Sequence, residues 1–509
     1  MGQVVNRRPL LHFFLAALAA GAAGGVGRTL SGGEAAPAAS SPKTSELWIG
    51  TAATSITPDK PVALIGSMAT RISRSVHSPV MASALALEGR RGGQVVDQAI
   101  FVSCDLAVLR GPPAIFRGGV VDKIRERIKD RLPGFDRQKL VVCATHTHAA
   151  PAMAEGEYDL PQEGLMQPGE YLEFLITRLG EAIVKAWQSR APGSMGWGLG
   201  HAVVGHNRRT AYADGHAEMY GKTNRPDFRG LEGYEDHGIG ILLFWDRDQK
   251  LVATAIDVAC PAQVMGTGLA ITADYWHEVR RRLAARHRES PVVLGWIGAA
   301  GDQSPTLPYG RSAEDRMLRL RGLSPVEEIG RRIDQAWGDV YQAACKDRRT
   351  DVPLVHKVQT IQLPMRKVTA EESAHAQVEA AKLAKQPLLR LKMQWYQRVV
   401  DRYQEQQAGR ATSYLMELHV VRLGDVAIAT NDFELFTDYG VQIQARSPAG
   451  QTFVIQLAGP ATYLPTERAV RAGGYSAIVE NNLVGPEGGQ VLVDRTVEAI
   501  NELWKKPTR

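Results

Sequence analysis

Three apolar runs in the middle of the chain constrain its fold most. They are Ile239–Trp245, Val252–Val258 and Pro291–Ile297, each short and bounded by turn-forming or polar residues. Runs of this kind are typical of strands that are buried on both faces. A predicted helix at 275–287 lies between the second and third runs, and another at 325–344 follows the third. The pattern therefore indicates sheets with helices packed against them.

The first part of the chain adds a hairpin to this pattern. Residues 83–88 and 95–103 read as two strands, and Arg90–Gly93 supplies the turn between them. Helical periodicity covers 120–131 and 170–189. The mixture of hairpins with strand–helix alternation predicts a mixed α/β fold, with layered mixed β-sheets covered by α-helices. A chain of 509 residues with 44% hydrophobic residues can bury a large core.

The chain divides into a leader and one large domain. Residues 1–46 read as an export signal and linker, and residues 47–509 as the domain. Within it, 369–407 is rich in Ala, Lys, Gln and Glu and lacks glycine. This composition predicts one or two long helices. We interpret them as a helical insertion at the surface with no chemistry of its own.

The leader has the features of a secretory signal. Arg7 and Arg8 precede the apolar stretch 10–18, which an Ala/Gly-rich segment follows. Paired arginines before a mild apolar region favour twin-arginine export to the periplasm or the outside of the cell. Cleavage after Ala22 or Ala38 fits the small-residue pattern. An ordinary signal or an uncleaved anchor is the alternative.

Charge and cysteine content exclude several classes of protein. The net charge of +6 is dispersed, and the longest basic tract is Arg280–Arg282 on a predicted helix. We therefore expect no nucleic-acid partner. The cysteines have scattered spacings that predict neither a disulfide framework nor a CxxC zinc site: Cys104, Cys143, Cys260 and Cys345.

The segment Cys143–Pro151 contains two histidines at a spacing that suggests chemistry. His146 and His148 follow the β-branched run Leu140–Val142. Strand side chains alternate faces, so both imidazoles should project from the same side of the strand end. Imidazole binds zinc and moves protons near neutral pH. A pair of surface histidines in a turn is the alternative interpretation.

Other polar residues also follow predicted strands. Gly298–Pro305 comes after the strand 291–297 and contains Ser304, in a position suited to a reacting or orienting hydroxyl. Asn431–Glu434 and Thr462–Thr466 come after two later strands in the same way. Each segment alone could be a structural turn, with Asp302 capping its own backbone in the first. Together they predict the rim of a site.

These motifs jointly resemble the N-terminal catalytic domain of the neutral/alkaline (non-lysosomal) ceramidases, from about Trp48 to the C-terminus. The resemblance lies in an opening strand and turn, a Thr-His-Thr-His signature, an Asn-Arg element, a Gly-Asp-x-Ser-Pro turn and two tyrosines twelve positions apart. The matching residues are Gly50–Pro58, Thr145–His148, His206–Arg208, Gly301–Pro305, Tyr463 and Tyr475.

The resemblance implies an exported, zinc-dependent amidohydrolase that cleaves the N-acyl amide bond of ceramide or a related N-acyl amine. Metal-bound hydroxide would attack the carbonyl. The implied Zn²⁺ ligands include His146, Glu434 and Tyr463. The residues implied around the carbonyl are His148, Arg208, Ser304 and Tyr475, with Ser304 as an orienter of water or a nucleophile.

One expected zinc ligand departs from the family pattern. Counting back about fourteen residues from Asp274, where the family has a second zinc histidine, gives Cys260. Thiolate binds zinc well, so Cys260 is our predicted fourth ligand. Its extra negative charge would make bound water less acidic. The alternatives are His277 as the ligand, or a vacant position with weak or absent metal.

The end of the chain also departs from the family. Only about 34 residues follow Tyr475, so the C-terminal immunoglobulin-like domain of full-size ceramidases is expected to be absent. Whether the protein prefers ceramide, and whether it makes a transient contact with a membrane surface, is then undecided. We expect a small-molecule or lipid substrate. The remaining alternatives are a zinc esterase or amidase acting on another acyl substrate, and a non-catalytic surface protein that has lost the metal.

Overall fold

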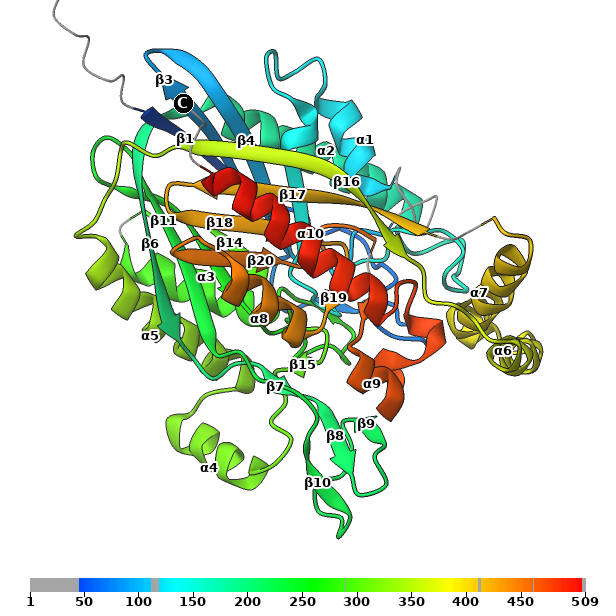
Figure 1. The fold of residues 1–509 in the computed structure, drawn as a ribbon. Coiled ribbons are helices and arrows are strands. Elements are labelled where there is room, and N and C mark those ends of the chain that lie inside the picture. The colour runs from blue at the N-terminus through cyan, green and yellow to red at the C-terminus, as the bar shows by residue number, and fades with distance from the viewer. Residues whose placement is uncertain (1–44, 111–118, 288, 411–412, 461, 506–509) are drawn as a thin grey trace, which may run out of the picture. The chain divides into compact units, whose positions relative to one another are not determined.

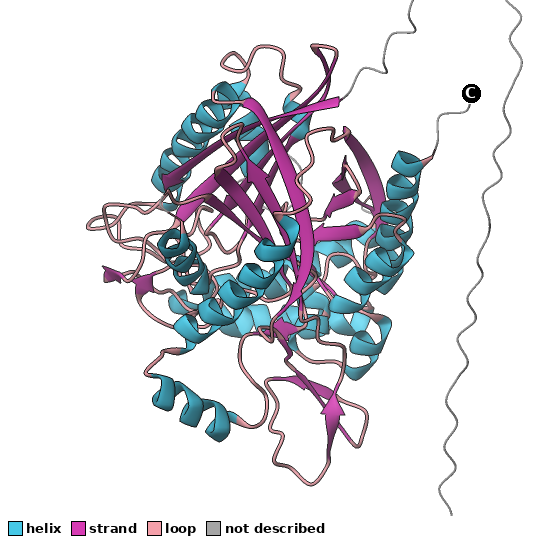
Figure 2. Ribbon diagram, turned by 90° about the vertical axis from the view of Figure 1, so that its left-hand side faces the viewer, coloured by secondary structure: helices cyan, strands magenta, loops and turns pink. Residues whose placement is uncertain are grey.

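The computed structural model describes residues 45–110, 119–287, 289–410, 413–460 and 462–505. The predicted export signal therefore lies almost entirely outside the described residues. The main compact unit begins at Thr44 and runs to the end of the chain. Two large sheets form its centre, and helices cover their outer faces (Figures 1 and 2). This arrangement confirms the predicted mixed α/β fold with layered sheets.

The larger sheet has eight strands in the order β14-β12-β11-β6-β1-β3-β4-β5. Most neighbours are antiparallel, but β14 with β12 and β4 with β5 are parallel. The strands are β1 (Ser45–Ser55), β3 (Met81–Arg91), β4 (Gln94–Cys104), β5 (Leu140–Ala144), β6 (Ala191–His201), β11 (Gly238–Trp245), β12 (Leu251–Val258) and β14 (Val292–Ile297). The predicted hairpin is β3–β4.

The smaller sheet has four strands in the order β16-β17-β18-β20. They are β16 (Leu354–Pro364), β17 (Ser413–Leu423), β18 (Val426–Thr430) and β20 (Gln451–Ile455). One buried cluster joins both sheets: Phe101, Phe244 and Trp296 of the larger sheet belong to it together with Ile428 and Phe453 of the smaller. Because helices also cover the opposite faces, the central strands are apolar on both sides, as the uninterrupted run in β11 predicts.

Four helices cover the larger sheet. One cluster packs α1 (Val120–Ile128) and α2 (Pro168–Gln188) against one half of the sheet, and another packs α3 (Tyr275–Arg286) and α5 (Pro325–Ala344) against the other. The Ser324 hydroxyl caps α5 in a reciprocal capping box, which explains its sharp start. The helix α4 (Arg311–Arg321) buries no residue, and α9 (Glu467–Ala472) contributes Ala469 to the cluster of the smaller sheet.

Two helices cover the outer face of the smaller sheet. They are α8 (Thr437–Arg446) and α10 (Pro486–Trp504), and α10 runs across the sheet in Figure 1. The segment 369–407 forms a pair of packed helices, α6 (Ala370–Leu383) and α7 (Arg390–Gln407), which project at one side of the sheets.

The loops carry short strand pairs that hold the site. The pairs are β2 (Ser75–Val76) with β13 (Ala270–Ile271), β7 (His206–Asn207) with β15 (Gln303–Ser304), and β19 (Glu434–Leu435) with β21 (Tyr463–Leu464). A three-stranded extension contains β8 (Arg209–Tyr212), β9 (Ala217–Met219) and β10 (Phe228–Leu231). Single turns of 3-10 helix occur at Arg137–Lys139, Pro387–Leu389, Tyr475–Ala477 and Val479–Asn481.

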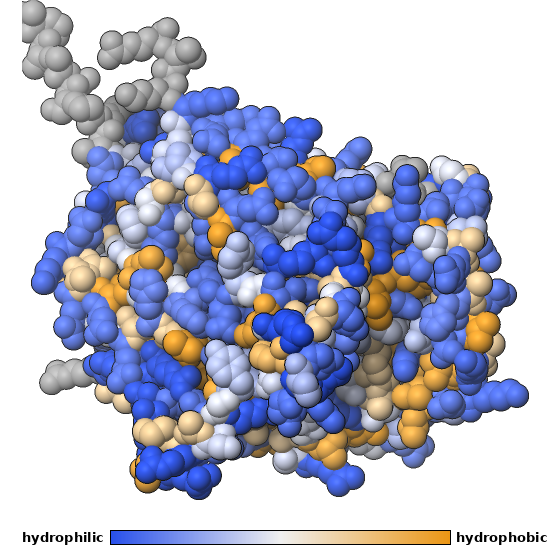
Figure 3. Space-filling view, turned by 60° about the horizontal axis from the view of Figure 1, so that its bottom comes forward, coloured by the Kyte–Doolittle hydropathy of each residue, from blue (hydrophilic) through white to orange (hydrophobic). Residues whose placement is uncertain are grey.

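The surface of the described part is mixed in polarity. The face seen in Figure 3 is mainly hydrophilic, and hydrophobic side chains are scattered over it. Among the described helices, none combines the length and the apolar character needed to cross a lipid bilayer.

Candidate active site

One large cavity, of about 660 Å³, receives residues from distant parts of the chain. This volume lies in the usual range for small-molecule sites. Five of the eight residues predicted for catalysis or zinc binding line it: His146, His148, Glu434, Tyr463 and Tyr475.

His146 reaches the cavity through an unusual backbone conformation. The strand β5 ends at Ala144, and His146 has a φ of 61°. A non-glycine residue in this left-handed region is strained, and such strain is concentrated at functional sites. The rings of His146 and His148 lie 4.8 Å apart between centroids. The predicted convergence of the two imidazoles therefore occurs, but in a turn instead of along an extended strand.

The hydrogen bonds of His146 define its tautomer. Its Nδ1 donates to the carbonyl oxygen of Ala107 at 2.6 Å. In the neutral ring the Nε2 atom then carries a lone pair, and it lies 3.1 Å from Oε2 of Glu434. Two acceptors facing each other at this distance require a proton or a cation between them.

Glu434 and Tyr463 are brought together by a very short strand pair. β19 and β21 are parallel, and Glu434 lies directly opposite Tyr463 in their register. Burial alone would raise the pKa of Glu434, but the charges of His146 and Arg208 and hydrogen bonds from His146 and Tyr463 lower it to about 2. The Glu434 carboxylate is therefore ionised at neutral pH.

The backbone behind Glu434 is held by a glycine. A Cβ atom on Gly301 would lie 2.3 Å from the carbonyl oxygen of Glu434, so no larger residue fits there. The amide of Gly301 also donates to the carbonyl of Leu435 at 2.7 Å. The Gly-Asp-x-Ser-Pro turn thus supports the strand that presents Glu434.

The donor set fits a zinc ion in kind. His Nε2 and carboxylate oxygen bind zinc at about 2.0–2.2 Å, so two such ligands in a tetrahedral site lie about 3.3 Å apart. The 3.1 Å between His146 and Glu434 agrees with that spacing, and the phenol of Tyr463 lies beside them. The hydrogen bond from His146 Nδ1 to a carbonyl is the support that zinc-binding histidines commonly have. Across the described ranges, however, no three His, Cys, Asp or Glu side chains form a metal-binding group by themselves.

His148 is neutral and held in place. Its Nε2 lies 2.8 Å from the side-chain amide nitrogen of Gln263. Burial and the neighbouring His146 lower the pKa of His148 well below its usual 6.5. A Cβ atom on Gly66 would lie 2.4 Å from the ring, and Gly66 also has a positive φ of 93°, so glycine is required there.

Arg208 lies behind Tyr463 instead of at the cavity wall. Its guanidinium donates to the hydroxyl of Tyr463 at 3.0 Å and to the carbonyl of Gly301 at 2.9 Å. The residue is only 4% exposed, so its charge acts in a region of low dielectric. Arg208 therefore orients the tyrosine hydroxyl and stabilises negative charge on it.

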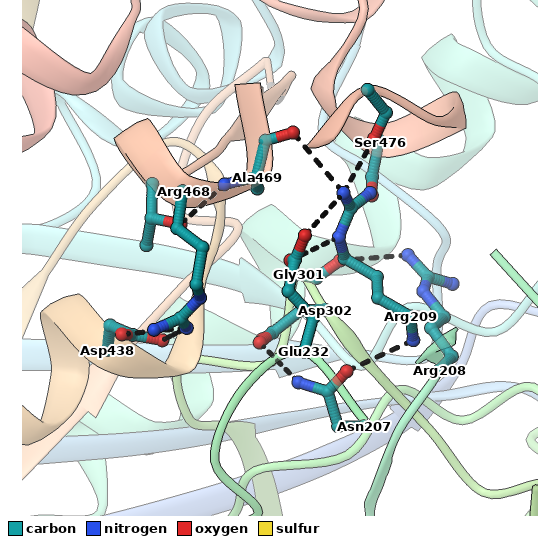
Figure 4. A network of polar contacts seen from close by, with 12 residues as sticks. Asn207, Arg208, Arg209, Glu232, Gly301, Asp302, Asp438, Arg468, Ala469 and Ser476 are labelled. Carbon is teal, nitrogen blue, oxygen red and sulfur yellow. Dashed lines mark hydrogen bonds and ion pairs between the residues drawn. The ribbon is translucent and has the colours of Figure 1, made fainter. Parts of the chain in front are cut away.

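A polar network connects Arg208 with the Gly-Asp-x-Ser-Pro turn (Figure 4). The side-chain amide of Asn207 donates to Asp302 at 2.8 Å. The backbone and hydroxyl of Thr437 donate to the other oxygen of Asp302 at 3.0 and 2.7 Å. Asp302 thus connects β7, the turn and α8, instead of only capping its own backbone.

Ser304 does not line the cavity. It is 1% exposed, and its Oγ lies 3.2 Å from the hydroxyl of Tyr220. Tyr220 has a φ of 58°, its amide donates to the carbonyl of Arg208, and it also contacts the guanidinium. Tyr220 therefore connects Ser304 with Arg208. Sequence analysis missed it, because a tyrosine in a polar loop carries no signal of its own.

Cys260 and His277 are not brought to the cavity. The thiol of Cys260 is fully buried in an apolar cluster, 3.7 Å from the carbonyl of Val204. Burial and Asp274 raise the pKa of this thiol well above its usual value, so it is protonated. His277 lies in the first turn of α3, and neither residue is among those that line the cavity.

The helical pair 369–407 contributes to the cavity, which sequence analysis did not predict. Leu391, Trp395 and Val399 of α7 line it. The ring of Trp395 packs against Tyr475 at 5.9 Å, and Tyr475 packs against Tyr463 at 6.1 Å. One face of α7 is therefore a wall of the site.

Two solved structures share this fold. One is a ceramidase complexed with C2, with a TM-score of 0.62 and 16% identity over 90% of this chain and 75% of that chain. The other is a neutral ceramidase from Pseudomonas aeruginosa, with a TM-score of 0.62 and 15% identity over 91% of this chain and 75% of that chain. They confirm, at the level of the fold, the resemblance inferred from the motifs. No family model matches the chain, and no curated protein is significantly similar to it.

Proposed function

We propose that this chain, which has the fold of the neutral ceramidases, hydrolyses the N-acyl amide bond of ceramide or a related N-acyl amine. The observation that carries the proposal is the convergence of His146, Glu434 and Tyr463 on one cavity. These residues come from widely separated segments, and their donor atoms are of the types that zinc binds.

The proposal includes a zinc ion held by His146, Glu434 and Tyr463. Zinc bound there would polarise the amide carbonyl and lower the pKa of a water molecule to about 7. Cys260 is the fourth ligand predicted from sequence. To bind, its thiol would have to turn away from the carbonyl of Val204 and lose its proton.

The chain's own residues supply the remaining steps. Neutral His148 has a lone pair on Nε2, where Gln263 now donates, and this atom can take a proton from the attacking water. The same atom can return the proton to the leaving nitrogen. Tyr475 lines the cavity and offers a hydroxyl to the developing oxyanion. Arg208 orients the hydroxyl of Tyr463 and stabilises negative charge on it. Ser304, connected through Tyr220, has an orienting role.

The test is release of fatty acid from a short-chain fluorescent ceramide by the purified protein. We expect turnover that a chelator abolishes and that the His146→Ala variant lacks. His201→Ala is the matched control, because His201 is exposed and does not line this cavity. Hydrolysis of acyl esters without amide turnover would instead favour the esterase alternative. A metal-free protein inert to both would favour a non-catalytic role.

We also propose export through the paired arginines of the leader. The expected result is a signal-cleaved protein outside the cytoplasm, and cytoplasmic retention when Arg7 and Arg8 are both replaced by Lys. Export of the doubly substituted protein at the wild-type level would exclude the twin-arginine route.

A further inference from the structure

The wall that α7 gives to the cavity is not purely apolar. Leu391, Trp395 and Val399 provide its apolar stripe, and Arg398 and Arg402 line the cavity between and beyond them. Arg398 lies three residues after Trp395, which places it about 4.5 Å further along the helix axis. Trp395 packs against Tyr475, which we propose to contact the reacting carbonyl. Arg398 is therefore about one turn of α7 away from this contact.

The two arginines differ in their partners. Arg402 donates to the carbonyls of Val479 and Arg366, both at 2.9 Å, so it ties α7 to neighbouring segments. In the part of the chain that the structure describes, no residue forms a hydrogen bond or an ion pair with the guanidinium of Arg398. Its charge is therefore available to a molecule in the cavity.

Charged side chains of both signs surround Arg398, but none of the described ones pairs directly with its guanidinium. Arg110 also lines the cavity and forms an ion pair with Glu157 at 3.3 Å. Burial and the charge of Arg110 lower the pKa of Arg398 to about 10, and Glu157 and Asp401 oppose this change. Arg398 is thus still cationic at neutral pH. Asp401 accepts a hydrogen bond from Gln397 on its own helix at 2.9 Å. Of the three side chains Arg110, Glu157 and Arg398, only Arg110 and Glu157 form an ion pair with each other.

We propose that the substrate is an N-acyl amine with an anionic group, such as a carboxylate or phosphate, that Arg398 binds inside the cavity. This inference rests on the proposed amidohydrolase function. A planar guanidinium binds carboxylate and phosphate through two parallel hydrogen bonds, and such charge-assisted bonds are strong away from bulk water. A neutral ceramide would leave the guanidinium of Arg398 without a direct partner.

Matched substrate pairs test the proposal and locate the anionic group. For the amine half, the pair is N-lauroylglycine and the neutral N-lauroylglycinamide. For the acyl half, it is the mono-N-butylamide of dodecanedioic acid and N-butyl lauramide. We expect kcat/KM of the wild-type protein to be at least about tenfold higher for the anionic member of one pair. Equal turnover of both members in both pairs would overturn the proposal.

Variants of α7 assign the preference to Arg398. Arg398→Met should bring the ratio within the preferred pair close to one, and Arg398→Lys should retain part of it. The control is Arg390→Gln, which removes the same charge from an exposed position of the same helix. A preference that survives in Arg398→Met would overturn the assignment, and loss of it in the control would show that net charge alone is responsible.

A binding measurement separates this proposal from the proposed function. Calorimetry with the His146→Ala variant compares N-lauroylglycine with N-lauroylglycinamide without turnover, and the second pair is measured in the same way. We expect at least about tenfold tighter binding of one anionic member, lost when Arg398→Met is added. If no amide is hydrolysed but this difference in binding is present, the hydrolase proposal fails and the arginine site stands. If amides are hydrolysed but the two members of each pair bind equally well, the arginine site fails and the hydrolase proposal stands.

Discussion

Replacing Gly301 by alanine should test how closely the site depends on its supporting turn. The added Cβ atom would lie 2.3 Å from the carbonyl oxygen of Glu434 and 2.8 Å from its carbonyl carbon. Ordinary contacts begin at 3.4 Å, so β19 or the turn must move by about 1.1 Å. Both contacts are to backbone, and neither can be relieved by rotating a side chain.

Two quantities should change together in the Gly301→Ala variant. Overpacking of this kind costs about 1–3 kcal/mol of unfolding free energy. A displacement of about 1 Å at Glu434 should also lower kcat/KM by up to about 100-fold, because it moves a proposed zinc ligand away from His146. Urea unfolding measures the free energy of unfolding. Turnover of a short-chain ceramide measures kcat/KM, and the zinc content is determined in parallel.

The control for this experiment is Gly119→Ala. Gly119 precedes α1 without a positive φ, and a Cβ atom there meets nothing within 4 Å. Gly119→Ala should therefore change neither the free energy of unfolding nor kcat/KM appreciably. The reasoning is refuted if Gly301→Ala keeps wild-type stability, or if it is destabilised while its zinc content and kcat/KM stay at the wild-type values.

Three further predictions concern a distant ion cluster, the residue missed by sequence analysis and the metal. Arg331 and Arg332 lower the pKa of Glu328 from 4.5 to about 2 through hydrogen bonds and their charges. The carboxylate therefore stabilises the fold above about pH 4.5, and this contribution is lost as the pH falls through 2. Urea unfolding should show Glu328→Gln to be less stable by about 3 kcal/mol at pH 7, with a smaller difference at pH 3; an equal difference at both pH values would contradict this. Tyr220→Phe should lower kcat about tenfold with little change in KM, because the hydroxyl at Ser304 orients groups instead of binding substrate; an unchanged kcat would contradict this. Metal analysis should find zinc lost in His146→Ala and retained in Cys260→Ala, since only the former side chain lines the cavity; zinc loss in both would make Cys260 a ligand.

The sequence predicted the large elements of the fold well because each contains either an uninterrupted apolar run or an apolar face with helical periodicity. The run in β11 is apolar throughout, and the structure covers it on both faces. The predicted helix 325–344 coincides with α5, whose capping box is visible as Ser324 followed by Glu327. The two-residue strands β7, β15, β19 and β21 could not be predicted, because two residues show no periodicity.

The site was only partly predictable for the same physical reasons. That His146 and Glu434 lie together was expected only from the family resemblance, because the sequence does not tell which strand ends are neighbours. The left-handed backbone conformation of His146 could not be predicted, because the position is not a glycine or asparagine, the residues that usually adopt it. Amphipathic periodicity in α7 indicates that one face is buried, but it does not tell whether that face meets the core or, as with Trp395, a cavity.

The position of α7 has a consequence for the diversification of such enzymes. The residues that would perform the reaction lie on loops of the paired sheets, whereas part of the surface that would recognise the substrate belongs to one contiguous excursion of the chain. Replacing the stretch between β16 and β17 as a cassette could therefore redirect selectivity in a single genetic step while the chemistry is left intact.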